Sequence, residues 1–378
     1  MHISKDKLTW IQLDITARCQ AMCLECARNI NGKDLNPLIG KANTWDMPLE
    51  IFQKAVTPSM LKNSLNEVVL NGNFGDPCIH PNFIDICKYV IENAHSELRL
   101  KISTNGAMFD VEYWTKIGKL LAPLKNHRII FGIDGLSDTH SIYRRNTKFE
   151  DVIRNAKAFI NAGGHAIWQF IIFNHNKHQT EEAKKLAEEI GFTSVFFKGG
   201  FNDDGGARNY VKAVNDDTTN TGAETKKEKA VDVSITERKA FKKAKDDLDK
   251  AINKIQKPTN TTTKPKAQSK QELLDTAKIT CQWYETNGMY IEYDGSVWMC
   301  CWIGDMHKTK SSTFMWKPIQ DRFGIHFNNL NYYSFDDILR HEFFVNYLDK
   351  TFNSTTTDPD TPRIETCAKT CIWGKTFV

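Results

Sequence analysis

Apolar and polar residues alternate along the first 200 residues in a pattern that predicts strands and helices in turn. Short apolar runs typical of buried strands are separated by segments with apolar residues at helical spacing. The expected strands are 8–15, 67–70, 98–103, 128–133, 167–173 and 194–198. The expected helices are 49–62, 81–94, 111–121, 149–162 and 179–190. The order predicts an α/β fold of parallel βαβ units with right-handed crossovers.

Such a sheet either stays open or curls toward a barrel. In both arrangements the functional residues gather at the carboxyl ends of the strands. The segments that directly follow the predicted strands are therefore the first candidates for chemistry.

The pattern changes between residues 201 and 275, which we expect to form a basic low-complexity linker or insert. Within it, residues 226–270 hold fourteen Lys and Arg against six Asp and Glu. One amphipathic helix is expected at about 235–256, with Ser234 and Glu237 as a capping box. The helix either lies on the body of the protein or serves as an arm for a partner or nucleic acid.

Residues 276–378 are expected to form a small cysteine-bearing α+β domain. Alternating apolar residues at 288–293 and 296–301 flank Asp294-Gly295, which predicts a β-hairpin with a tight turn. Residues 1–200 and 276–378 are thus the two compact parts of the chain.

Composition and charge narrow the function classes. The net charge of +4 is concentrated in the 226–270 segment, so a nucleic-acid surface on the body of the protein is not expected. No apolar run has the length of a membrane helix, and the N-terminus has no signal-peptide core. We therefore expect a cytoplasmic protein with no membrane partner. Disulfides are rare in that compartment, so the ten cysteines of the chain indicate metal binding or catalysis.

Three cysteines follow the first predicted strand at C-x3-C-x2-C spacing: Cys19, Cys23 and Cys26. A [4Fe–4S] cluster has four irons, so three thiolates leave one iron open to another ligand. A structural zinc site and a chance grouping are the alternatives. Zinc loops usually supply a second ligand pair nearby, and none is present in the adjacent sequence.

The motifs along the first 200 residues together resemble the radical S-adenosylmethionine (SAM) superfamily. The C-x3-C-x2-C loop follows the first strand, and Gly75-Asp76-Pro77, after the next strand, is similar to the family's Gly-Gly-Glu-Pro motif. Ser103-Thr104-Asn105-Gly106 ends the third strand, and Asp134-Gly135 ends the fourth, ahead of Arg144-Arg145. Singly, these segments are ordinary turns. Their order at successive strand ends carries the resemblance.

The resemblance implies a partial (βα)6 TIM-like barrel that binds SAM at the open iron of the first cluster. It implies that eight residues contact SAM: Gly75, Asp76, Pro77, Ser103, Asn105, Asp134, Arg144 and Arg145. An arginine pairs with the SAM carboxylate in relatives, as a charge-assisted contact. The chain departs from the usual motifs at Glu25, Phe74 and Asp76, where an aromatic residue, Gly and Glu are common.

The C-terminal cysteines resemble the family's auxiliary-cluster domains, called SPASM or, in a shorter form, twitch. Cys281-x13-Gly295-x4-Cys300 fits the C-x9–15-G-x4-C signature, and Cys367-x3-Cys371 completes four ligands for a second [4Fe–4S] cluster. The number of cysteines suits the one-cluster twitch form. Cys301 is an alternative to Cys300, but adjacent residues of a strand face opposite ways. Zinc is the alternative metal for these four thiols.

By this resemblance the chain is an oxidoreductase or maturase that cleaves SAM reductively to a 5′-deoxyadenosyl radical. The radical abstracts hydrogen from a carbon of a peptide, a protein side chain or a small molecule. A flavodoxin or ferredoxin is the expected electron donor, and the catalytic acid or base is not apparent from the sequence. The alternatives are a zinc-binding interaction protein and a degenerate scaffold of the same fold without catalysis.

Overall fold

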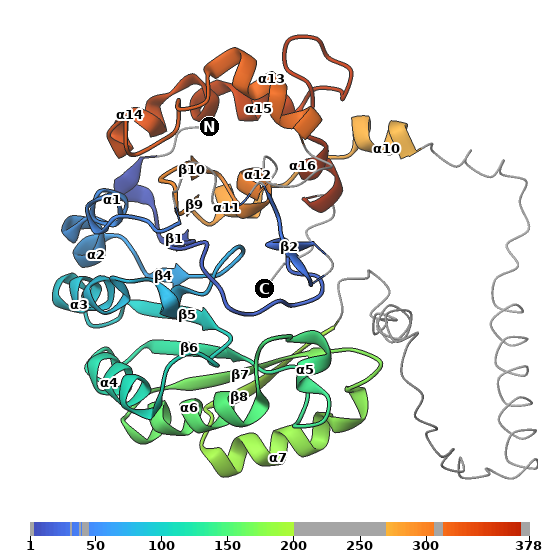
Figure 1. Cartoon of the computed structure of the whole chain (residues 1–378). Helices are drawn as coiled ribbons and strands as arrows, with labels where there is room; N and C mark the ends of the chain where they lie inside the picture. Colours follow the sequence, from blue (N-terminus) through green and yellow to red (C-terminus); the bar gives the residue numbers. More distant parts are fainter. Residues whose placement is uncertain are drawn as a thin grey trace, which may run out of the picture.

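The computed structural model describes residues 4–30, 32–37, 39, 45–199, 270–305 and 313–371. Its centre is one eight-stranded sheet with the order β10-β9-β1-β4-β5-β6-β7-β8 (Figure 1). Six parallel strands follow the chain order across it: β1 (Trp10–Leu13), β4 (Glu67–Leu70), β5 (Arg99–Thr104), β6 (His127–Gly132), β7 (Ala166–Ile172) and β8 (Ser194–Gly199). The expected α/β fold, a partial barrel built on six parallel strands with helices between them, is confirmed.

Helices cover one face of this sheet, as Figure 1 shows on its left and lower sides. They are α1 (Leu49–Ala55), α2 (Pro58–Asn63), α3 (Phe83–Asn93), α4 (Val111–Leu121), α6 (Phe149–Asn161) and α7 (Thr180–Ile190). The short helix α5 (His140–Tyr143) lies apart from them, in the segment after β6 that contacts the first cysteine loop. Alternate strand residues such as Ile11, Leu13, Leu100 and Ile102 are buried on that face in the main hydrophobic core. Gln12 and Asp14 therefore point to the opposite, inner face.

The C-terminal part extends the sheet. Strand β9 (Gly288–Ile291) pairs in parallel with β1, and β10 (Val297–Trp298) pairs antiparallel with β9. Around them lie α10 (Lys270–Thr276), α11 (Gln282–Glu285), α12 (Cys301–Gly304), α13 (Thr313–Phe323), α14 (Phe335–Arg340), a π-helix (Phe343–Tyr347), α15 (Leu348–Phe352) and α16 (Glu365–Thr370). The α+β character is as expected, but its hairpin continues the barrel sheet.

Local differences from the sequence expectation have simple causes. The helix expected at 49–62 is two helices, because Pro58 starts a new one with Thr57 as its N-cap. Helix α3 begins at Phe83, so Pro81 precedes it. The hairpin loop spans 293–295, since Glu292 N–H donates to Ser296 O, and Gly295 supplies the left-handed conformation at φ +87°.

Two small strands, β2 (Asn29–Ile30) and β3 (Asp34–Leu35), pair after the first cysteine loop. The predicted 235–256 helix and most of the 201–275 segment lie outside the described residues. None of the described helices has the length and apolarity needed to cross a membrane.

Candidate radical SAM site

Polar loops from five neighbouring strands meet at the carboxyl edge of the sheet. They follow β1, β4, β5, β6 and β7, so the motifs that the sequence placed at strand ends do share one edge. A pocket of about 400 Å³ lies there beside Cys19, lined by Arg18, Gln20, Arg28, Trp45, Ile79 and Met108.

The first cysteine loop is docked on the segment that follows β6. Met22 N–H donates to Arg145 O at 2.9 Å, and Leu24 N–H donates to Tyr143 O at 3.3 Å. Cys19, Cys23 and Cys26 all pack beside one small apolar group that includes Tyr143 and Phe173. The loop is thus held by the backbone of the α5 region, and the three thiols gather over the same side chains.

Burial governs the acidity of these thiols. It raises the pKa of Cys19 to about 12 and that of Cys23 to about 11, and it raises the pKa of Cys26 as well. The other thiols and Asp76 raise the Cys19 pKa further, whereas Arg144 opposes the rise at Cys23. Three thiolates here therefore need added positive charge, which iron provides.

This donor set suits an iron–sulfur cluster. Thiolates are the usual ligands of such clusters, and three of them leave one iron without a protein ligand. Cys78 and Cys87 lie in the main core instead. Within the described ranges, no three His, Cys, Asp or Glu side chains are already grouped around a single metal-ion position.

The loop after β4 approaches the chain after β1 closely, and its glycines make this possible. A Cβ atom on Gly75 would lie 2.1 Å from Thr16 O, and one on Gly72 would lie 1.9 Å from Gly75 O. Phe74, which departs from the family motif, is buried beside Ala17 and Tyr293. The unusual aromatic residue therefore anchors the loop, while both glycines remain sterically required.

Asp76 is fully engaged within the protein. Its carboxylate accepts hydrogen bonds from Cys78 N–H (3.0 Å), the Thr104 hydroxyl (2.9 Å), Asn105 N–H (2.7 Å) and Asn105 Nδ2 (2.5 Å). Burial raises its pKa, and these bonds oppose the rise. Asp76 therefore ties the β4 loop to the end of β5, and Pro77 continues from it into a single 3₁₀ turn, Pro77–Ile79.

Asn105 links this network to the cysteine loop. Its Nδ2 lies 3.6 Å from Cys19 Sγ, and its Oδ1 accepts from Gln20 Nε2 at 2.6 Å. The neighbouring Ser103 is half-buried at the end of β5. Sequence reasoning missed Thr104 and Gln20, although the Ser-Thr-Asn-Gly turn placed Thr104 next to two predicted residues.

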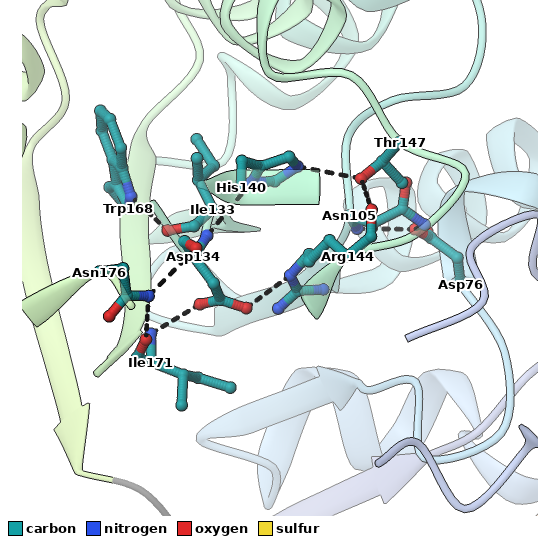
Figure 2. A network of polar contacts seen from close by, with 10 residues as sticks. All are labelled: Asp76, Asn105, Ile133, Asp134, His140, Arg144, Thr147, Trp168, Ile171 and Asn176. Atoms are coloured by element: carbon teal, nitrogen blue, oxygen red, sulfur yellow. Dashed lines mark hydrogen bonds and ion pairs between the residues drawn. The ribbon is translucent and has the colours of Figure 1, made fainter. Parts of the chain in front are cut away.

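A second network follows β6 and is drawn in Figure 2. Arg144 Nε donates to Asp134 Oδ2 at 2.7 Å, and Ile171 N–H donates to Asp134 Oδ1 at 2.6 Å. Asn176 Nδ2 bridges Asp134 O and Ile171 O. The Asp134 carboxylate has no exposed surface and is occupied by these donors.

Arg144 carries its charge into the middle of the site. Its guanidinium opposes the rise in pKa that burial causes at Cys23 and at Asp76, which come from two different loops. Gly132 leaves room for it, since a Cβ there would lie 2.3 Å from Arg144 Nη2. Arg145 contributes its backbone carbonyl, which holds the cysteine loop.

The C-terminal cysteines form a second group next to the sheet. Thr280 N–H donates to Cys371 O at 2.9 Å, which brings the two ends of the domain together. Burial raises the pKa of Cys300, and the nearby Cys367, Cys301 and Cys281 raise it further. Burial and the nearby Cys371 have the same effect on the pKa of Cys367. These four thiols therefore lie close enough to one another to interact electrostatically.

Cys301 has carboxylates among its charged neighbours. Burial raises its pKa above the ordinary range, and the next contributions come from Asp305 and Asp14. Asp14 stands at the end of β1, on the inner face of the sheet. Neither cysteine belongs to a strand, because β10 ends at Trp298, Cys300 is the N-cap of α12 and Cys301 is its first residue. The alternation expected for adjacent strand residues therefore does not apply to this pair.

Comparisons with known proteins agree with this geometry. Residues 13–190 match the radical SAM superfamily, and residues 281–372 match the SPASM iron–sulfur cluster-binding domain. The chain belongs to the radical SAM superfamily and carries a SPASM-type domain. Its cofactors are accordingly SAM and [4Fe–4S] clusters.

Solved structures with a similar arrangement include Streptococcus suis SuiB bound to the precursor peptide SuiA, at 13% identity and a TM-score of 0.47. That alignment covers 97% of this chain and 76% of SuiB. Native anSMEcpe with bound AdoMet and Kp18Cys peptide is another, at 12% identity and a TM-score of 0.48, over 96% of this chain and 89% of that one. No curated protein matches the chain.

Proposed function

We propose that this chain is an oxidoreductase or maturase that uses SAM to abstract hydrogen from a substrate carbon. When bound, the first cluster supplies the electron that cleaves SAM to a 5′-deoxyadenosyl radical. The observation that carries the proposal is the convergence of three thiols, the Arg144 guanidinium and the β4 loop at one sheet edge. Cys19, Cys23 and Cys26 are its proposed ligands.

The residues around that cluster have separate roles in this proposal. Arg144, oriented through Nε by Asp134, presents its terminal nitrogens to the SAM carboxylate. The Gly75–Pro77 turn offers backbone polar groups to the SAM amino group, while Asp76 holds that turn through Thr104 and Asn105. Ser103 and Arg145 complete the surrounding wall. Cys23 and Asp134 are buried, which keeps water away from that side of the reacting centre.

We assign a second [4Fe–4S] cluster to Cys281, Cys300, Cys367 and Cys371. Four thiolates saturate such a cluster, so it acts as an electron relay or a structural staple. A relay next to the barrel favours net oxidation or cross-linking of the substrate. The substrate class stays a peptide, a protein side chain or a small molecule, and a flavodoxin or ferredoxin is the proposed donor.

A SAM-cleavage assay tests the function. Protein purified and reconstituted without oxygen is mixed with SAM and dithionite, and 5′-deoxyadenosine is quantified for wild type and Cys23→Ala. Wild type should form it and Cys23→Ala should not, whereas Cys87→Ala, a core thiol, serves as the matched control. Equal product from wild type and Cys23→Ala would refute the assignment. Bound zinc without iron would favour an interaction protein, and a loaded cluster without cleavage would favour a scaffold.

A further inference from the structure

Asn73 lies at the tip of the β4 loop and contacts the first cysteine loop. Its carbonyl lies 4.0 Å from Cys26 Sγ, within reach of a thiol hydrogen bond. Its backbone N–H donates to Asp14 Oδ2 at 3.2 Å, and its side chain lies 3.1 Å from that of Asn71. The carboxylate of Asp14, which directly follows β1, therefore holds the tip of this loop.

Tyr290 reaches the same carboxylate from the C-terminal part of the chain. It lies opposite Gln12 in the pairing of β9 with β1, so its ring points to the inner face. The wholly buried phenol donates to Asp14 Oδ2 at 3.0 Å and accepts from Asn73 Nδ2 at 3.4 Å. One side chain of β9 thus contacts both the loop and its anchor, across more than 200 residues of sequence.

Helix α12 and the residue after it, which follow Cys300, fix the position of Tyr290. A Cβ atom on Gly304 would lie 2.6 Å from the Tyr290 ring, so α12 packs directly against it. Asp305 Oδ1, one residue further, lies 3.4 Å from the phenol oxygen. Contacts therefore run without a break from the C-terminal cysteine group through Tyr290 to Asn73 and Cys26.

We propose that Tyr290 is a positioning residue for SAM, through which the C-terminal domain completes the SAM-binding loop. The proposal rests on the assignment of the Gly75–Pro77 turn, at the end of the same loop, to SAM in the proposed function. Without the phenol hydroxyl, Asp14 loses a donor and Asn73 Nδ2 loses an acceptor. Both groups are shielded from water there, so leaving them without a hydrogen bond raises the free energy of this conformation of the loop. The loop tip then loosens, and the backbone groups that hold SAM lose their preorganisation.

Tyr290→Phe tests this in the full-length, cluster-loaded protein. We expect the SAM dissociation constant to rise about tenfold, with iron content unchanged. Amide hydrogen exchange of residues 71–77, measured without SAM, should speed up by a similar factor. Tyr89→Phe is the matched control, because its phenol also donates one hydrogen bond, to Val56 O at 2.8 Å, among the helices on the other face. Both quantities should stay at wild-type values in that variant.

A double-mutant cycle separates positioning from general destabilisation. Asp14→Asn keeps an oxygen for Asn73 N–H but removes the charge, so its effect on SAM affinity should not add to that of Tyr290→Phe. Additive losses, or a Tyr290→Phe variant with unchanged exchange at 71–77, would overturn the proposal. If exchange responds but wild type neither binds nor cleaves SAM, the positioning of the loop stands and the proposed function fails.

Discussion

Arg144 holds its Nε 2.7 Å from Asp134 Oδ2, and the carboxylate side chain is completely buried. A buried charge pair of this kind stabilises little by itself, because both groups lose their hydration. Its value here is orientation. With Nε occupied, the two terminal nitrogens of the guanidinium are the ones left to face the cysteine loop.

Arg144→Lys should therefore impair SAM binding more than it impairs folding. Lysine keeps the charge but lacks the fork that satisfies Asp134 and a ligand carboxylate together. We expect the SAM dissociation constant to rise by at least about tenfold, equivalent to about 1.4 kcal/mol. Titration of the loaded protein with SAM, followed by the change in its electron paramagnetic resonance spectrum, measures this. Arg128→Lys, at a guanidinium that contacts His127 O and His165, is the control and should bind SAM normally.

Cys300 and Cys301 should behave oppositely when each is replaced by alanine. Two cubane clusters contain about eight irons. Cys300→Ala should lose up to about half of them, because its thiol faces the other C-terminal cysteines. Cys301→Ala should keep them, because the charged groups that most affect its thiol are Asp305 and Asp14 rather than the other C-terminal cysteines. Iron and sulfide analysis after anaerobic reconstitution distinguishes the two. Iron lost from Cys301→Ala and kept in Cys300→Ala would reverse the assignment.

Much of this site was predictable because its parts are local in sequence. A strand followed by C-x3-C-x2-C, and turns at successive strand ends, are short-range patterns, and parallel strand order places their ends at one edge. The α/β fold followed from the same alternation. The break before Pro58 was also readable, since proline starts a helix readily and continues one poorly.

The contacts between distant segments were not predictable in this way. That Asp76 would accept four hydrogen bonds from its own loop and the next strand end depends on the register of β4 with β5. That β9 would join the sheet beside β1, and bring Tyr290 to Asp14, depends on a pairing across more than 200 residues. Single-chain periodicity carries no information about such partners.

Two buried histidines should make the protein less stable in mild acid. His127 Nδ1 donates to Leu124 O and its Nε2 accepts from His165 N–H, so both nitrogens are matched only in the neutral ring. Burial lowers the pKa of His127 to about 4 and that of His140 to about 3. The unfolded chain, with a pKa near 6.5, then binds protons that the folded state does not.

The free energy of unfolding should consequently fall as the pH drops below about 6.5, and the loss should continue toward the folded-state pKa values. Each histidine contributes at most about 1.4 kcal/mol per pH unit. Urea unfolding between about pH 7.5 and 5.5 measures the slope. His127→Gln should be less stable at neutral pH but show a shallower slope, and an unchanged slope would exclude His127 as a source.

The hydrogen bonds of Asp76 should contribute to the free energy of unfolding as well as to the shape of the site. Thr104→Val keeps the shape of the side chain but removes a hydroxyl that donates to Asp76 and accepts from Gly106 N–H, so we expect a loss of at least about 1 kcal/mol. Asp76→Ala leaves the N–H groups of Cys78 and Asn105 without their acceptor, for which we expect about 2–4 kcal/mol. The free energy of unfolding from urea titration of the loaded protein checks both values. Asp110→Ala, which removes an exposed helix cap, is the control at about 1 kcal/mol.

If Asp76→Ala costs no more than that cap, the carboxylate is not the tie between the β4 loop and β5. A larger loss in Asp76→Ala, with the Thr104→Val and Asp76→Ala effects failing to add in the double variant, is the result that the shared hydrogen bond requires.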